Sequence, residues 1–265
     1  MTTEDMPGVA RRPILSTKGI SKSFGAIAAL RGIDFELYAG EVLGVVGDNG
    51  AGKSTFIKIL SGALIPDAGT IEVDGHQVQF KGLLDARRAG IETVFQELAV
   101  VALMDVEENF FLGRELTVPG PFSFFRFLRK NAMRNQAREE IASLRVGLPS
   151  VRQRVGNLSG GQRQSVAVAR AVAWSRKIVI MDEPTAALGV KESRGVQELI
   201  KRVRERGIAV ILISHSMPQL FDVTDRIFVF RHGAHAGTVA TVDTDMETVV
   251  RLITGAQIHE HTRAS

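Results

Sequence analysis

Cysteine is absent from this 265-residue sequence. Its absence excludes disulfide bonds, thiolate metal sites and a cysteine nucleophile, and it is compatible with a reducing compartment. Long apolar runs are also missing: IAVILIS (208–214) is among the longest, far short of the roughly 20 residues that a membrane-spanning helix needs. The N-terminal stretch MTTEDMPGVARRPIL lacks the apolar segment of a secretory signal. We therefore expect a chain that does not cross a membrane unaided.

A strong excess of charge of either sign is missing as well. The formal net charge is +4, and the lysines and arginines are dispersed along the sequence. Charge alone therefore gives no reason to expect a nucleic-acid partner, and it favours an ordinary solvated surface. The hydrophobic fraction of 45% and the charged fraction of 23% are typical of a soluble globular protein.

Short apolar runs alternate with helical patterns along most of the chain. This alternation predicts an α/β fold with a mainly parallel sheet and right-handed crossovers. From Leu98 to about Val155 the strand signals disappear, and helical spacing such as AMRNQAREEIASLRVG (132–147) replaces them. TIEVDGHQVQF (70–80) alternates around Asp74-Gly75, which is a hairpin signal. The expected strands include IDFEL (33–37), EVLGVV (41–46), IETVFQ (91–96), KIVIMDEP (177–184), IAVILIS (208–214) and RIFVF (226–230).

These patterns predict one domain over residues 1–265, because no internal repeat or low-complexity linker divides the chain. Its core would comprise about 14–96 and 176–255, and a helical subdomain of about 97–175 would be inserted between them. We expect an antiparallel β subdomain at the N-terminal end of the core and a C-terminal tail over 256–265.

The sequence GDNGAGKST follows an apolar strand and opens a helix, as the phosphate-loop pattern G-x-x-x-x-G-K-[ST] requires. Its glycines let backbone N–H groups approach phosphates, Lys53 supplies a positive charge, and the Ser54 hydroxyl can bind Mg²⁺. A glycine-rich turn that only caps a helix is the alternative. The expected nucleotide-binding residues are Gly47, Asp48, Asn49, Gly50, Ala51, Gly52, Lys53, Ser54 and Thr55.

The stretch IVIMDEP (178–184) is an apolar run that ends in two carboxylates. Asp182 would emerge at the carboxyl end of its strand beside the phosphate loop, where it can hold Mg²⁺ through water. Glu183 is the candidate general base for an attacking water. Taken alone, the pair could also be a helix N-cap with Pro184 at the first helical position.

Gln96 and His215 each follow an expected strand, so their side chains can converge with the carboxylates on one ligand. Gln96 could contact Mg²⁺ and the water, and His215 could donate to a γ-phosphate. Only their positions distinguish them from structural residues.

A second glycine pair occurs in NLSGGQ (157–162), at the start of a predicted helix, where an anion can bind. The phosphate loop, Gln96, NLSGGQ, IMDEP and His215 follow one another in the order found in ATP-binding cassette (ABC) proteins. The chain resembles their ATPase domain along nearly its whole length.

This resemblance implies a head-to-tail dimer with two equivalent ATP sites. Ser159, Gly160, Gly161 and Gln162 would then bind the ATP held by the partner's phosphate loop. Phe24 matches the aromatic residue that stacks on adenine, which is usually tyrosine. Gly189 stands where most ABC proteins have an aspartate that helps to link the two sites.

Three segments are similar to the ATPases of bacterial monosaccharide importers, especially the fructose-type subgroup. They are GIETVFQELAVVALMDVEENFFLGRE (90–115), DEPTAALGVKES (182–193) and LISHSMPQLFDVTDRI (212–227). The resemblance implies an ATP-hydrolysing subunit that uses Mg²⁺ and works as a homodimer at the cytoplasmic face of the inner membrane. Permease subunits would be its direct partners, a sugar-binding protein an indirect one, and nucleic acid none.

Two other functions remain open at this point. One is a non-transport cassette in DNA repair or translation, although the long coiled-coil insertion or second cassette of such proteins is absent here. The other is an importer ATPase for a solute that is not a sugar. PFSFFRFLRK (121–130) also has two interpretations, core packing of the helical subdomain or a docking surface for a transmembrane subunit.

Overall fold

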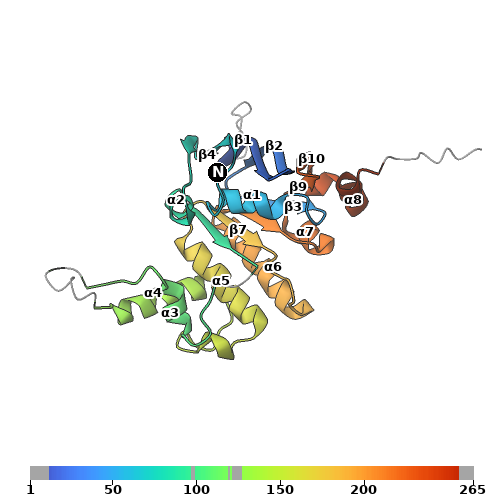
Figure 1. Ribbon diagram of the computed structural model, residues 1–265. Coiled ribbons are helices and arrows are strands. Elements are labelled where there is room, and N and C mark those ends of the chain that lie inside the picture. The colour runs from blue at the N-terminus through green and yellow to red at the C-terminus, as the bar shows by residue number, and fades with distance from the viewer. Residues whose placement is uncertain (1–11, 97–98, 119, 121–126, 257–265) are drawn as a thin grey trace, which may run out of the picture.

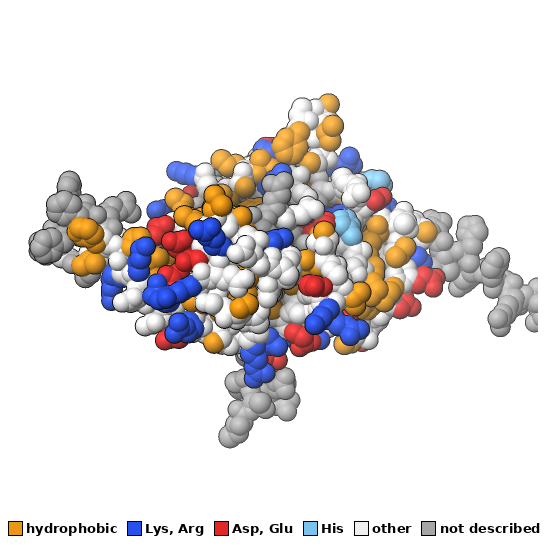
Figure 2. Space-filling model, turned by 90° about the horizontal axis from the view of Figure 1, so that it is seen from below, with side chains coloured by type: hydrophobic (Ala, Val, Ile, Leu, Met, Phe, Trp, Pro, Cys, Tyr) orange, Lys and Arg blue, Asp and Glu red, His pale blue; other side chains and the backbone are white. Residues whose placement is uncertain are grey.

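The computed structural model describes residues 12–96, 99–118, 120 and 127–256 (Figure 1). Two β-sheets form its upper part in this view, and helices α3, α4 and α5 gather below them. This arrangement agrees with the expected α/β core and helical insertion. The face shown in Figure 2 carries basic and acidic side chains intermixed, so the mild net charge is not gathered into a patch of one sign there.

The smaller sheet is antiparallel and has the strand order β2-β1-β4-β5. Its strands are β1 (Leu15–Phe24), β2 (Ile27–Leu37), β4 (Ala68–Val73) and β5 (His76–Val78). Val73 pairs with His76 across the two-residue turn, in which Asp74 (φ 54°) and Gly75 (φ 72°) both adopt positive φ. Positive φ at both central residues characterises the type I′ hairpin turn, so the predicted Asp-Gly hairpin is confirmed.

The larger sheet has the order β10-β9-β3-β8-β7-β6. All its neighbouring strands are parallel except β10, which pairs antiparallel with β9. The continuous apolar runs of the sequence correspond to its central strands, where both faces are covered. The strands are β3 (Val42–Gly47), β6 (Ile91–Val94), β7 (Ile178–Asp182), β8 (Ala209–Ile213), β9 (Arg226–Arg231) and β10 (Ala234–Ala240).

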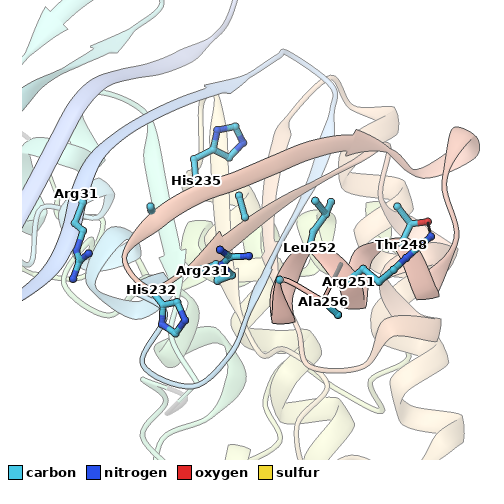
Figure 3. Close-up of a pocket in the computed structure, with 11 residues that line it drawn as sticks. Arg31, Arg231, His232, His235, Thr248, Arg251, Leu252 and Ala256 are labelled. Carbon is cyan, nitrogen blue, oxygen red and sulfur yellow. Dashed lines mark hydrogen bonds between the residues drawn. The ribbon is translucent and has the colours of Figure 1, made fainter. Parts of the chain in front are cut away.

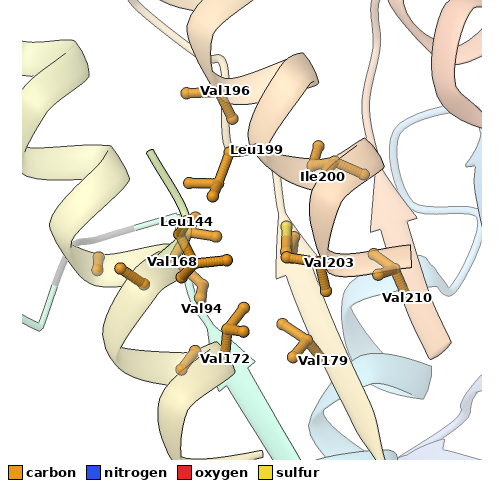
Figure 4. Packing of buried hydrophobic residues seen from close by; sticks show 14 of the residues in the cluster. Val94, Leu144, Val168, Val172, Val179, Val196, Leu199, Ile200, Val203 and Val210 are labelled. Carbon is orange, nitrogen blue, oxygen red and sulfur yellow. The ribbon is translucent and has the colours of Figure 1, made fainter. Parts of the chain in front are cut away.

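Two buried clusters hold these layers together. In the first, α1 packs between the two sheets, and Phe56 of α1 makes an edge-to-face contact with Phe35 of β2. The second lies between the large sheet and helices α5 and α6 (Figure 4). Its buried residues continue into α3 and α4. The helices are α1 (Lys53–Leu60), α2 (Leu83–Arg88), α3 (Val106–Phe111), α4 (Lys130–Ser143), α5 (Gly160–Trp174), α6 (Val190–Glu205), α7 (Met217–Val223) and α8 (Met246–Thr254).

The two longest helices between 97 and 175 can be compared with the sequence prediction. Helix α5 starts at Gly160, so the glycine pair forms its first turn, as expected. Helix α4 covers 130–143 rather than 132–147, and Arg145 just beyond it has a positive φ of 51°. Over the described residues, no helix has both the length and the apolar character needed to cross a bilayer.

The phenylalanine-rich segment 121–130 lies mostly outside the described residues. Of its last residues, Phe127 and Leu128 are exposed by 58% and 45%, so core packing is wrong for these two side chains. The backbone N–H of Val118 donates to the carbonyl of Phe127, so these two residues, which come before and after positions 121–126, lie next to each other.

Candidate nucleotide site

The phosphate loop connects the end of β3 to the start of α1, as the sequence predicts. Two of its glycines are required by close neighbours. A Cβ on Gly47 (φ 152°) would lie 2.5 Å from the carbonyl oxygen of Phe230, and one on Gly52 (φ 104°) would lie 2.7 Å from that of Ala29. Any side chain would also be strained at these φ values. The loop is therefore held tightly between β2 and β9.

Lys53 lies inside this loop and is 7% exposed. Its Nζ donates to the carbonyl oxygens of Gly47 at 2.7 Å and Asp48 at 3.0 Å. Burial lowers the pKa of Lys53, while the negative charges of Glu183, Asp48 and Asp182 oppose that shift. A positive charge is thus fixed at the N-terminus of α1, where the backbone N–H groups of the first turn also favour an anion.

Asp182 and Glu183 follow one another where β7 ends. Glu183 has a positive φ of 50°, and its backbone N–H donates to Ile213 of the neighbouring β8 at 3.0 Å. This bond fixes the turn that directs the Glu183 side chain toward His215. The distance from Glu183 Oε1 to His215 Nε2 is 2.7 Å. The predicted base and the predicted γ-phosphate contact are therefore direct neighbours.

The two carboxylates produce a site suited to a cation. Burial raises the pKa of Asp182, and the adjacent Glu183 charge adds to this rise, while Lys53 opposes it. The Ser54 hydroxyl and the Asp182 carboxylate line the same cleft and supply hard oxygen ligands. The described residues contain no cluster of three or more His, Cys, Asp or Glu that could bind a metal by itself, so a cation in this cleft would depend on the oxygens of Ser54 and Asp182. This donor set fits Mg²⁺, which commonly takes one or two protein oxygens and completes its shell with phosphate and water.

A cleft of about 310 Å³ brings most of the predicted residues together. Gln96, Asp182, Glu183 and His215 come from the ends of β6, β7 and β8, and they meet there the phosphate loop, which follows a fourth strand, β3. The sequence analysis did not predict Ala29 and Ile213, which also line the cleft. The described residues that line the cleft are Ala29, Asn49, Gly50, Ala51, Gly52, Lys53, Ser54, Thr55, Gln96, Asp182, Glu183, Ile213 and His215.

Several predicted residues do not line this cleft, namely Gly47 and Asp48 at the start of the phosphate loop, Phe24, and the stretch Ser159–Gln162. Phe24 is at the end of β1, 52% exposed, with Lys22 Nζ 5.9 Å from its ring centroid. The stretch Ser159–Gln162 is in the first turn of α5, and none of its four residues lines the cleft of its own chain.

Ser159 caps α5 through a reciprocal pair of hydrogen bonds. Its hydroxyl accepts from the backbone N–H of Gln162 at 3.2 Å, and the Gln162 side chain accepts from the backbone N–H of Ser159 at 3.0 Å. Gly161 is required for a different reason, since a Cβ there would lie 2.6 Å from Cβ and Cγ of Glu192 on α6. The capping box and the close contact with α6 fix this turn in position.

The model of the ABC transporter family matches residues 30–186, which include the phosphate loop, Gln96, the Ser159–Gln162 turn and both carboxylates. This chain belongs to the ABC transporter family. The fructose import ATP-binding protein FrcA of Rhizobium meliloti is 50% identical over 94% of this chain and 96% of its own length. The xylose/arabinose import ATP-binding protein XylG of Sulfolobus acidocaldarius is 42% identical over 91% of this chain and 94% of its own length. The ribose import ATP-binding protein RbsA 1 of Rubrobacter xylanophilus is 41% identical, and the chain covers 48% of its length.

Solved ABC cassettes share the fold. The ADP conformation of MJ1267, an ATP-binding cassette of an ABC transporter, superposes with a TM-score of 0.80 at 25% identity and covers 92% of this chain and all of its own. The dimeric post-hydrolysis state of the cassette MJ0796, bound to ADP and phosphate, superposes with a TM-score of 0.71 at 25% identity. The match covers 86% of this chain and 98% of that one. The expected ABC ATPase fold and the adenine-nucleotide ligand are therefore confirmed.

In this ABC ATPase, Gly189 is the N-cap of α6 and has φ −68°, a conformation open to any residue. An added Cβ would approach only the Oε2 atom of Glu192, at 2.6 Å, which is the far end of a flexible side chain. Neither the backbone conformation at position 189 nor a close backbone neighbour therefore requires glycine there.

We expect Gly189→Asp to leave ATPase activity within a few-fold of the wild type. Aspartate is a favoured N-cap and Glu192 stands three residues later, so the new side chain would cap α6 and add a few tenths of a kcal/mol. Steady-state phosphate release and thermal unfolding measure the two effects. Severe loss of turnover in a protein that unfolds normally would show that the glycine itself is needed for activity.

Proposed function

We propose that this ABC ATPase hydrolyses ATP at the cytoplasmic face of a membrane to drive monosaccharide uptake through a separate permease. The observation that carries the proposal is the 50% identity to a fructose import ATP-binding protein over nearly the full length of both chains. A xylose/arabinose import protein matches over a similar extent, which supports a single-cassette subunit for a simple sugar.

Each cleft residue has a distinct proposed role. Glu183 orients the attacking water and takes its proton, and His215, at 2.7 Å, donates toward the γ-phosphate or to Glu183. Lys53 binds the phosphates, and Gln96 contacts the water or the cation. Ser54 and Asp182 would hold Mg²⁺, which supplies charge neutralisation at the phosphate oxygens when bound.

The Ser159–Gln162 turn serves the ATP of a second copy in this proposal. Its place outside the cleft of its own chain supports that role, as does a neighbouring fold that was solved as a dimer. Phe24, exposed at the end of β1, is left free to stack on adenine. A sugar-binding protein would act on the permease from outside.

The permease would dock at the groove that begins beside Gln96. Glu92 is buried in this groove, where Arg87 and Arg114 both pair with it. Arg170 lines the same groove, and its Nη1 donates to the carbonyl of Ala99 at 2.8 Å. Three guanidinium groups around one carboxylate favour an acidic docking segment. Leu103, in the loop before α3, is 82% exposed and available for contact.

Other functions receive less support. A role in DNA repair or translation is not favoured, because the relatives described above are sugar import ATP-binding proteins. An importer for another solute would share every feature of the cleft, so uptake must be measured directly.

Deletion of the gene should abolish high-affinity uptake of one monosaccharide, with fructose tested first. Labelled-sugar uptake in the deletion strain, complemented with the wild-type gene or with Glu183→Gln, measures this. Only the wild type should restore transport. Normal uptake of every monosaccharide, together with a defect for amino acids, metals or peptides, would exclude the sugar assignment.

The same strain tests the docking groove. Leu103 does not line the groove, but it is four residues beyond Ala99, which does. Leu103→Glu should fail to restore uptake while the isolated subunit still binds ATP, because an acidic side chain next to the groove would repel the acidic docking segment. Val242→Glu is the matched control, since Val242 is 90% exposed at the 3₁₀ turn Thr241–Asp243 near the other end of the chain. Full transport with Leu103→Glu would place docking elsewhere.

A further inference from the structure

A second cavity, of about 810 Å³, lies between the β9–β10 hairpin, β2 and α8 (Figure 3). It is separate from the nucleotide cleft, with which it shares no lining residue. Its size falls in the range of small-molecule sites. The described residues that line it are Arg31, Arg231, His232, Ala234, His235, Ala236, Thr248, Arg251, Leu252, Gly255 and Ala256.

The charge of this cavity is positive. Arg31, Arg231 and Arg251 reach it from β2, β9 and α8, and none of its described lining residues is an aspartate or glutamate. Within the part of the chain that the structure describes, no ion pair involves any of these three arginines. Three arginines that line one hollow, with no acidic residue among its described lining, make it favourable for an anion.

The local backbone brings these groups inward. Gly255 ends α8 with a positive φ of 74°, and an added Cβ there would overlap the Arg231 guanidinium. Glycine therefore lets Arg231 lie against the end of α8. Arg251 Nη2 donates to Thr248 Oγ1 at 2.9 Å, which orients the guanidinium and leaves its other N–H groups for a ligand.

His232 and His235 have different roles. His232 is at the exposed hairpin turn beside Arg231, where its ring can add a donor (Figure 3). His235 stacks on Phe228 with 4.2 Å between ring centroids, and its Nε2 bonds to Thr238 Oγ1 at 2.9 Å. Burial also lowers the pKa of His235. We therefore count three guanidinium groups and His232 as the anion-binding set.

We propose that this cavity binds a phosphorylated small organic molecule, such as a sugar monophosphate. Planar guanidinium groups bind phosphate oxygens in pairs, and a phosphate dianion matches three arginines better than a single carboxylate does. The side chains of Leu252, Ala234, Ala236 and Ala256 supply apolar wall for the organic part. The inference does not depend on which solute is transported.

The cavity is joined to the phosphate loop by backbone hydrogen bonds. Arg31 N–H donates to the Gly233 carbonyl at 2.7 Å, and Gly233 N–H donates to the Ala51 carbonyl at 3.1 Å. Because the phosphate loop also binds phosphate, a test must keep the two sites apart.

Isothermal titration of the full chain with fructose 6-phosphate, in saturating ADP and Mg²⁺, provides this test. We expect saturable binding that weakens at least ~10-fold in Arg31→Gln/Arg231→Gln, because two charge-assisted contacts are lost. Arg152→Gln, an exposed arginine with no described side-chain partner, is the matched control and should bind normally. Lys53→Ala should also bind fructose 6-phosphate normally.

The folding of the double variant is checked by thermal unfolding. Arg31 and Arg231 are both exposed, so the double variant should unfold at the wild-type temperature. If it unfolds at a lower temperature, binding is measured with the two single variants instead.

Three results would overturn the proposal. Unchanged affinity in correctly folded arginine variants would exclude the cavity. Loss of binding in Lys53→Ala, or competition by ADP, would assign the ligand to the nucleotide cleft. Equal binding of inorganic phosphate or of unphosphorylated fructose would exclude recognition of a phosphorylated organic molecule.

Discussion

Replacing Glu183 by glutamine should reduce ATP turnover by at least ~10²-fold while Mg-ATP still binds. Glutamine keeps the shape of glutamate, and its amide oxygen can take the place of the Glu183 Oε1 atom that lies 2.7 Å from His215 Nε2, so the geometry of the turn is preserved. What is lost is the basicity needed to take a proton from water. Single-turnover phosphate release and equilibrium binding of a fluorescent ATP analogue measure the two properties separately.

Lys53→Ala is the comparison that distinguishes chemistry from binding. In the proposed mechanism Lys53 binds the phosphates before reaction, and its Nζ also donates to the carbonyls of Gly47 and Asp48, so its loss should weaken nucleotide affinity as well. Near-normal turnover in Glu183→Gln would remove Glu183 from the role of base.

Glu183→Gln protein should shift from monomer to dimer when ATP is added, and Ser159→Arg in the same chain should abolish that shift. A dimer that cannot hydrolyse its ATP stays closed, so the shift reports the shared site. Ser159 caps α5, and arginine would remove the cap, add bulk and place a cation at the positive end of the helix. Size-exclusion chromatography with and without ATP measures the shift.

The double variant should still bind ATP as a monomer, because Ser159 does not line the nucleotide cleft of its own chain. Loss of the cap alone costs about 1 kcal/mol, which a folded domain tolerates. Thr70→Arg, at an exposed hydroxyl residue of β4, is the matched control and should dimerise normally. If the Ser159 variant binds no ATP, the turn serves its own phosphate loop and the head-to-tail model is wrong.

Most of the nucleotide cleft could be predicted from the sequence because its residues stand at the ends of apolar strands. Parallel strands end at the same edge of a sheet, so Gln96, Asp182 and His215 were expected together and do line one cleft. Ala29 escaped prediction because it is on a part of β2 whose small and basic residues give no apolar alternation. Ile213 is the last residue of β8, two before His215, so its place at the end of a strand could have predicted that it lines the cleft.

Other parts of the fold depend on contacts that are distant in sequence. Strand β1 pairs with β2 and β4 through registers interrupted by irregularities, which obscure its period of two. Strand β10 is made of small, half-buried residues that give little hydrophobic signal. The need for glycine at 161 is likewise invisible locally, because Glu192 comes close to it only when α5 packs on α6.

The apolar cluster that continues from the large sheet into α3 and α4 bears on how the chain folds. Val179 of β7, Val168 of α5 and Met133 of α4 belong to this one cluster, although the sequence between 97 and 175 is an insertion. Removing the insertion would expose apolar surface on both sides of the cut, so neither part has a complete interior of its own. We therefore expect the helical segment and the sheet that it covers to unfold together, so that loss of packing at α4 also weakens the strand that ends in Asp182.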